Sequence, residues 1–209
     1  MLPLLAFDSS AAFCAAALLL PDRIILRDEQ MAKGQAERLM PMLEEVLAEG
    51  GLVWRDLKAI AVGIGPGNFT GVRISVAAAR GLALGLGIPA VGVTRLEALA
   101  HGLLRPIRVI EDARRGEVYV QEFTEAGAGM AVLAEMVEFA GPVTGPVTGS
   151  VTGSAAGPDA LAPACSLAEA IARIGVLRAA SPQPRPSPFY LRGADASPPT
   201  DPPPVILDA

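Results

Sequence analysis

The most informative stretch of this chain is Gly65-Pro66-Gly67-Asn68-Phe69-Thr70-Gly71-Val72-Arg73. It joins the apolar run 59–64, which has the character of a buried strand, to a segment expected to be helical from about Val72. A glycine-rich turn before a helix presents backbone N–H groups at the positive end of the helix dipole, which suits phosphate or carboxylate. Thr70 is the expected cap of the helix. The Gly-Lys-Ser/Thr ending of a Walker A loop is missing, and a tight turn that only packs the helix on a sheet is an equally good interpretation.

The segments around this stretch predict a mixed sheet covered by helices. The first strand ends in the polar turn Asp8-Ser9-Ser10, and the next two strands form a hairpin around Pro21-Asp22-Arg23. Apolar residues at helical spacing predict an amphipathic helix, and Thr94 with Glu97 has the spacing of a capping box. The expected elements are strands 4–7, 13–20, 24–28 and 59–64, with helices over 39–47, from about 72, and from 94.

The second half of the chain resembles the start of a second, similar unit. Runs 107–110 and 117–124 are expected strands on either side of Asp112-Ala113-Arg114-Arg115-Gly116, and 167–177 is an expected helix. The segment 141–153 repeats Val-Thr-Gly and is expected to be a loop with a short strand. The predicted domains are a first lobe over 1–104, a reduced second lobe over 105–192, and a proline-rich, disordered and dispensable tail over 193–209.

The helix that follows the glycine-rich turn is built largely from small residues, so another helix can approach it closely. Glycine inside a helix costs about 1 kcal/mol relative to alanine, and close packing is the natural compensation for Gly81 and Gly85. Packing against the chain's own sheet is one explanation, and packing against a second protein is the other. The predicted partner interface comprises Val72, Arg73, Val76, Ala79, Arg80 and Ala83.

The composition restricts the class of protein and its compartment. The chain has 209 residues, of which 51% are hydrophobic, and a net charge of −5. An acidic chain binds phosphate backbones poorly by itself, so a partner is expected to supply most contacts to any nucleic acid. Cys14 and Cys165 are read as buried, reduced thiols. No targeting or membrane segment is evident, and the expected location is the cytoplasm.

The sequence offers candidate contacts to a nucleotide but no catalytic constellation. The candidates are Asp8, Ser9, Ser10, Gly65, Gly67, Asn68, Thr70 and Asp112. For the first three, an ordinary turn with side-chain-to-backbone hydrogen bonds is the more economical interpretation. His101 is the single histidine and is expected on the surface or at a helix cap, so a two-histidine zinc site is excluded. Neither a catalytic residue nor a metal ligand is predicted.

Four motifs in this order resemble the bacterial TsaB (YeaZ) family. They are Asp8-Ser9-Ser10, the stretch 65–73, Asp112-Ala113-Arg114-Arg115-Gly116-Glu117-Val118-Tyr119, and Pro188-Phe189-Tyr190-Leu191-Arg192. The second and third motifs are long and specific, and the resemblance is strong over about 1–124. It implies an α/β, actin-like ATPase fold built from two ribonuclease-H-like lobes with mixed sheets, the second of them reduced.

The resemblance also implies partners and a function. Proteins of this family pair with the related subunit TsaD, joined by the ATPase TsaE, and the complex transfers a threonylcarbamoyl group to the adenosine beside the anticodon of tRNA. TsaD carries the metal and the chemistry, whereas here the corresponding helix start has Lys33 and Glu37 in place of histidines. The expected role is therefore a non-catalytic scaffold, which is a homodimer when alone and reaches tRNA through the complex.

Two other functions stay open at this point. One is a weak actin-like ATPase, with Asp8 and Asp112 beside magnesium and the stretch 65–73 near phosphate. No cofactor is required by the leading interpretation, and ATP or ADP with magnesium at the subunit interface is the alternative. A metalloprotease is disfavoured because the chain has one histidine.

Overall fold

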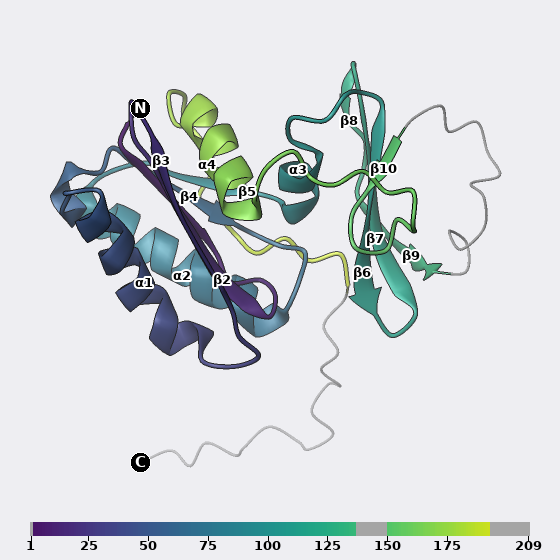
Figure 1. Cartoon of the computed structure of the whole chain (residues 1–209), viewed down its shortest axis with the longest axis horizontal. Helices are drawn as coiled ribbons and strands as arrows, with labels where there is room; N and C mark the ends of the chain where they lie inside the picture. Colours follow the sequence, from purple (N-terminus) through teal and green to yellow (C-terminus); the bar gives the residue numbers. More distant parts are fainter. Residues whose placement is uncertain (1, 137–149, 193–209) are drawn as a thin grey trace, which may run out of the picture.

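In this computed structural model, residues 2–136 and 150–192 are described, and they form two sheets with helices around them (Figure 1). The first sheet has the strand order β3-β2-β1-β4-β5. Its strands are β1 (Leu4–Asp8), β2 (Phe13–Leu19), β3 (Ile24–Gln30), β4 (Ala59–Gly63) and β5 (Ala90–Val93). Strand β1 pairs antiparallel with β2 and parallel with β4, so the first sheet is mixed.

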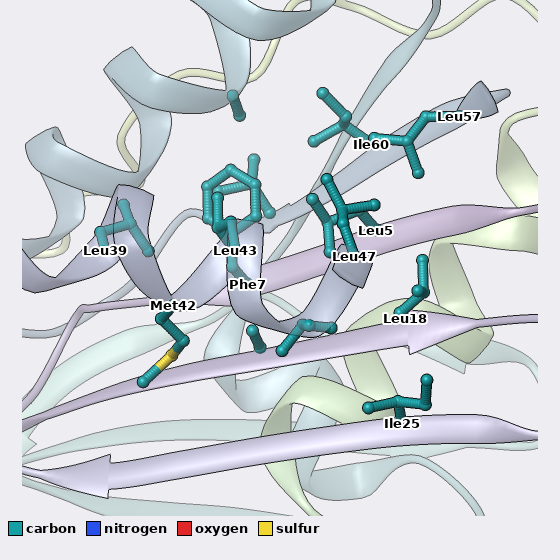
Figure 2. Close-up of a cluster of buried hydrophobic side chains, with 14 of the residues drawn as sticks. Leu5, Phe7, Leu18, Ile25, Leu39, Met42, Leu43, Leu47, Leu57 and Ile60 are labelled. Carbon is teal, nitrogen blue, oxygen red and sulfur yellow. The ribbon is translucent and has the colours of Figure 1, made fainter. Parts of the chain in front are cut away.

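Strand β1 lies at the centre of the first sheet, and all five of its residues are buried. Alternate side chains point to opposite faces of a strand. Leu5 and Phe7 therefore face α1 (Gln35–Glu49) and α2 (Phe69–Leu86), whereas Leu4 and Ala6 face α4 (Leu167–Arg178). Figure 2 shows Phe7 and Leu5 packed beneath the leucines of α1. The first sheet thus lies between two layers of helix, as its continuous apolar strands require.

The second sheet has the order β10-β6-β7-β8, and β9 also pairs with β7. Its strands are β6 (Ile107–Arg114), β7 (Glu117–Thr124), β8 (Gly127–Ala128), β9 (Val132–Glu135) and β10 (Ser150–Thr152). Strands β6 and β7 are antiparallel, whereas β10 runs parallel to β6. The short helix α3 (Arg95–Ala100) lies between the sheets and packs Leu96 and Leu99 against the second one (Figure 1). The prediction of two mixed sheets is confirmed.

The predicted domain boundaries need one correction, because α4 does not belong with the second sheet. Ala168, Ile171 and Ala172 of α4 are buried against β1 and β4 of the first sheet. Gly175 allows this close approach, since a Cβ there would overlap the side chain of Ala61. The first lobe therefore combines the segment up to α3 with α4, and the predicted lobe 105–192 is not one packed unit.

Several predicted elements also differ in extent or were missed. Strand β5 was missed, helix α2 begins at Phe69 and not near Val72, and β6 continues through Asp112 to Arg114. Residues 141–149 of the predicted repeat and the tail 193–209 lie outside the described residues.

Candidate functional site

A cleft of about 1010 Å³ separates the two sheets, and the four motifs meet in it. Ser10 lies in the turn after β1, and Gly67 and Asn68 lie in the loop between β4 and α2. Asp112 comes from the β6–β7 hairpin, and Tyr190 comes from the segment that follows α4. Residues far apart in sequence thus line one cavity, which makes this cleft the candidate functional site.

The turn Asp8-Ser9-Ser10 forms the rigid floor beneath this cleft. Asp8 and Ser9 are fully buried, and neither lines the cavity. The Asp8 Oδ1 atom accepts a hydrogen bond from the Ser10 N–H at 2.6 Å, and the Ser9 hydroxyl donates to the Gly71 carbonyl at 2.8 Å. A Cβ at Gly63 would overlap the Asp8 carboxyl group, and one at Gly71 would overlap the Ser9 carbonyl oxygen. Asp8 and Ser9 therefore hold the glycine-rich stretch in place, and neither side chain reaches the cleft that four of the other predicted ligand contacts line.

Burial also sets the protonation of Asp8. It raises the pKa of the Asp8 carboxyl above its ordinary value of 3.8, and the hydrogen bonds from Ser10 and the charge of Arg95 offset only part of this effect. A carboxyl group whose charged form is disfavoured by burial, and which does not line the cleft, is a poor magnesium ligand.

We expect Asp8→Asn to make the folded chain less sensitive to pH. Because the pKa of Asp8 is raised on folding, the native state keeps a proton that the unfolded state releases above pH 3.8. The stability of the fold therefore falls as the pH rises from 3.8 through the raised pKa of the folded state. Asparagine does not titrate, so the melting temperature of the variant relative to the native chain should increase as the pH rises from about 4 to about 8. Differential scanning fluorimetry across this range measures it. A native chain that gains on the variant at high pH would mean that the carboxylate is charged in the fold.

Asn68, and not Thr70, caps helix α2. Its side-chain oxygen accepts a hydrogen bond from the Gly71 N–H at 3.0 Å, and its own N–H donates to the Ser10 carbonyl at 2.6 Å. Thr70 is exposed and does not line the cleft, so the sequence prediction of this cap is wrong. Asn68 thereby fixes the start of α2 against the floor turn.

A partly buried ion pair joins the two lobes at the base of the cleft. The Arg95 Nε group donates to Glu111 Oε2 at 2.7 Å, and Glu111 Oε1 accepts from the Ser154 N–H at 2.6 Å. The Nη1 atom of Arg95 is buried and has no hydrogen-bond partner among residues 2–136 and 150–192. This pair was not predicted, because Arg95 follows a helix cap and Glu111 lies inside an apolar strand, and only the fold brings them together.

The β6–β7 hairpin forms the opposite wall. Arg114 and Arg115 both have positive φ values, 66° and 57°, and the Asp112 carboxylate accepts a hydrogen bond from the Arg114 N–H at 2.8 Å. Asp112 lies within β6, where the register shifts, and not after the strand as the sequence suggested. Its side chain nevertheless lines the cleft.

The C-terminal segment ties both lobes together across the cleft. On the first lobe, the Phe189 N–H donates to the Ile64 carbonyl at 2.8 Å, and the Arg73 Nε group donates to the Tyr190 hydroxyl at 3.0 Å. On the second lobe, Arg192 donates to the Ala113 carbonyl at 3.0 Å and forms an ion pair with Glu117. The motif 188–192 is therefore a clasp between the lobes.

Of the eight candidate ligand contacts, four line the cleft and four do not. Ser10, Gly67, Asn68 and Asp112 line it. Asp8, Ser9, Gly65 and Thr70 lie outside its lining. Within the part of the chain that the structure describes, no three His, Cys, Asp or Glu side chains are grouped so that they could hold a metal ion.

The predicted partner interface on α2 divides between two faces. Val72, Val76, Ala79 and Ala83 are buried within the chain, so assigning them to a partner is wrong. Arg73 and Arg80 are exposed, and the outward face of α2 is defined by five exposed residues, Ala77, Arg80, Gly81, Leu84 and Gly85. Gly81 and Gly85 have open space where a Cβ would lie. By length and apolar composition α2 also matches a membrane span, the one helix among residues 2–136 and 150–192 that does, although it packs on the sheet as a crossover helix.

The remaining reactive side chains lie away from the cleft. His101 is the C-cap residue of α3, as expected, and burial and two nearby arginines lower its pKa. Cys14 is buried with a pKa raised to about 11, chiefly by burial, whereas Cys165 is only half-buried, so the prediction of two buried thiols is half right. Cys14 and Cys165 are both free thiols.

The sequence and fold of this chain match those of known proteins. The family model described as TsaD, tRNA N6-adenosine threonylcarbamoyltransferase, matches residues 28–144. The tRNA threonylcarbamoyladenosine biosynthesis protein TsaB of Escherichia coli is 38% identical over 125 residues, which are 57% of this chain and 54% of that protein. The chain thus spans about half the length of this relative.

Two further relatives match nearly the whole chain. An uncharacterized protein of Mycobacterium tuberculosis is 31% identical over 200 residues, or 93% of each protein. The structure of YeaZ from Pseudomonas aeruginosa is 29% identical, with a TM-score of 0.72 over 91% of this chain and 100% of that one. The motifs, the two mixed sheets and these matches together show that the chain belongs to the TsaB (YeaZ) family and has its actin-like fold.

Proposed function

We propose that this chain is a non-catalytic binding subunit in the synthesis of threonylcarbamoyladenosine in tRNA. The name of its Escherichia coli relative, a tRNA threonylcarbamoyladenosine biosynthesis protein, supports the pathway. The observation that carries the binding role is the outward face of α2, where Leu84 is 80% exposed and two glycines occupy open space. An apolar helix face of this kind seldom stays uncovered.

The proposed partner is a TsaD-like subunit that packs a helix on this outward face. Small residues allow two helices to approach closely. The cost of placing Gly81 and Gly85 inside a helix is then offset only when a partner packs on this face. Arg80 lies on the same face and is suited to an acidic residue at the rim of the interface. Without the partner, the same face would join two copies of the chain. A TsaE-like ATPase completes the proposed complex, which binds tRNA.

We also propose that this chain catalyses no step of the reaction itself. It is supported by the closed position of Asp8 and by the location of His101 at a helix end away from the cleft. A reconstituted reaction that contains TsaD-like and TsaE-like proteins, tRNA and the threonylcarbamoyl donor tests it. Modification should require this chain in amounts equal to the TsaD-like subunit. Full activity without the chain would refute the proposal.

In that reaction we expect Asp8→Asn to retain the native rate within a few fold. Its carboxyl group holds a turn by hydrogen bonding, and asparagine can accept the same bond from Ser10. Liquid chromatography and mass spectrometry of digested tRNA measure the modified nucleoside. A loss of about 100-fold or more, the scale of removing a general acid–base group, would show that this chain takes part in chemistry. A thermal melt of the variant separates such a loss from unfolding.

Nucleotide binding in the cleft is a second candidate function. It is favoured by the buried Nη1 atom of Arg95 at the base of the cavity. The closed Asp8 disfavours a magnesium-dependent ATPase, so ATP or ADP would bind here without turnover. Calorimetry with ADP, in the presence and absence of magnesium, tests both parts of this candidate.

A further inference from the structure

Two aromatic rings stand half exposed at the mouth of the cleft. Phe69 and Tyr190 stack with ring centroids 5.2 Å apart, and 48% and 44% of their surfaces remain exposed. The Arg73 guanidinium lies 3.6 Å from the centre of the Phe69 ring and also donates to the Tyr190 hydroxyl. These three residues form what we call the aromatic platform. Because each of them is held by another, the platform is fixed before any ligand arrives.

The wall opposite the platform presents positive charge from the turn of the β6–β7 hairpin. Arg114 and Arg115 adopt positive φ values, which are unfavourable for residues other than glycine, asparagine and aspartate. Positive φ values at consecutive residues are the geometry of a tight β-hairpin turn, and this turn joins β6 to β7. The Arg114 side chain forms an ion pair with Asp112, with 3.6 Å between Nη1 and Oδ2, and is 84% exposed. Because an ion pair so exposed to water is weak, the guanidinium can also meet an anionic ligand in the cleft.

The platform and this turn are close neighbours. Arg192, two residues after Tyr190, donates to the Ala113 carbonyl at 3.0 Å and to the Arg114 carbonyl at 3.4 Å. The cleft as a whole is basic, although the chain carries a net charge of −5. Its lining includes the acidic residues Glu111 and Asp112 and five arginines, at positions 73, 95, 114, 115 and 192. A ligand that meets both features has a flat π-system and a negative group beside it.

We propose that the mouth of the cleft binds one unpaired nucleotide of an RNA strand. The base stacks on the aromatic platform, and its phosphate lies against Arg114. Stacking on aromatic rings beside a basic groove is how proteins hold single strands with little preference for sequence. The proposal rests on the proposed function in one respect, because tRNA is the RNA that the complex presents. Free nucleotides share this chemistry, and the experiment separates the two sources.

The test measures binding of a short fluorescein-labelled single-stranded RNA to the full chain and to its complex with the TsaD-like subunit, by fluorescence anisotropy. Tyr190→Leu should weaken binding about tenfold, whereas Tyr190→Phe, which keeps the ring, should bind nearly as the native chain does. Arg114→Gln should lower the salt dependence of log K by about 0.7, the value for one phosphate of a single strand. The matched control Arg55→Gln removes an exposed charge away from the cleft and should change neither result.

Competition identifies the source of the nucleotide. Unlabelled single-stranded RNA should displace the probe, while AMP, inorganic phosphate and a duplex of the same sequence should compete weakly. AMP that binds as tightly as RNA would overturn the assignment to RNA, and a duplex that binds equally well would show general attraction to phosphate. Equal binding by the native chain and Tyr190→Leu would also overturn it. A chain that still binds the TsaD-like subunit and supports modification, but shows any of these results, refutes this site and leaves the proposed function intact.

Discussion

Leu84→Arg is expected to weaken association of this chain with a TsaD-like subunit, and with itself, by about 100-fold or more. Leu84 is 80% exposed on the outward face of α2, where it touches little of its own chain. A partner helix that packs closely on this face would have to bury the new guanidinium without a carboxylate, and an unpaired buried charge costs several kcal/mol. The monomer should keep its melting temperature. Size-exclusion chromatography with light scattering and a pull-down with the partner measure the two associations.

Leu177→Arg is the matched control for this experiment. Leu177 is a leucine of similar exposure, 76%, on helix α4, which covers the other face of the same sheet. The control should leave both associations unchanged. Equal loss in both variants would point to a general effect of the added charge, and no loss in Leu84→Arg would place the interface elsewhere on the chain.

A second large effect is expected from two glycines of the same helix. Gly71→Ala should lower the stability of the chain by about 3 kcal/mol, because its Cβ would overlap the Ser9 carbonyl oxygen. Gly81→Ala should raise stability by about 1 kcal/mol, because its Cβ would enter open space and alanine favours the helix. In a chain of this size these values correspond to a melting temperature about 6–12 °C lower and about 2–4 °C higher.

Both variants make the same chemical change, so they serve as controls for each other. Circular dichroism melts at one protein concentration give the comparison. If Gly71→Ala proved as stable as the native chain, the turn Asp8-Ser9-Ser10 would have to move away from α2 without loss. If Gly81→Ala were destabilising in the monomer, the space beside Gly81 would be filled in solution.

Local signals in the sequence predicted most of the first lobe. The apolar spacing of α1 identified Leu39, Met42, Leu43, Val46 and Leu47, and all five are buried. The Thr94 side chain accepts from the Glu97 N–H, as the capping box required. Strand β5 was missed because its residues continue an apolar run from the end of α2, where only Gly87 and Pro89 mark the break.

The errors on α2 have a different origin. Periodicity separates the faces of a helix, but small residues lie on both faces of α2, so composition could not tell the sheet-facing side from the outward one. Val72, Val76, Ala79 and Ala83 were assigned outward and pack inward. The residues of the cleft were predicted only in part, because many of its contacts join residues that are far apart in the sequence. Arg95, Glu111 and Arg192 act through contacts across 16 to 79 positions of sequence, which no local pattern records.

Because α4 returns to the first sheet after the second sheet is complete, the second sheet is an insert in the chain of the first. Residues between α3 and α4 could shrink or change without removing either helix layer of the first sheet. The reverse does not hold. A fragment that stops at residue 104 would leave Ala6, Ala15 and Ala61 without the helix that covers them. An isolated first lobe would therefore have to be made by joining α3 directly to α4 with a short linker, and not by truncation.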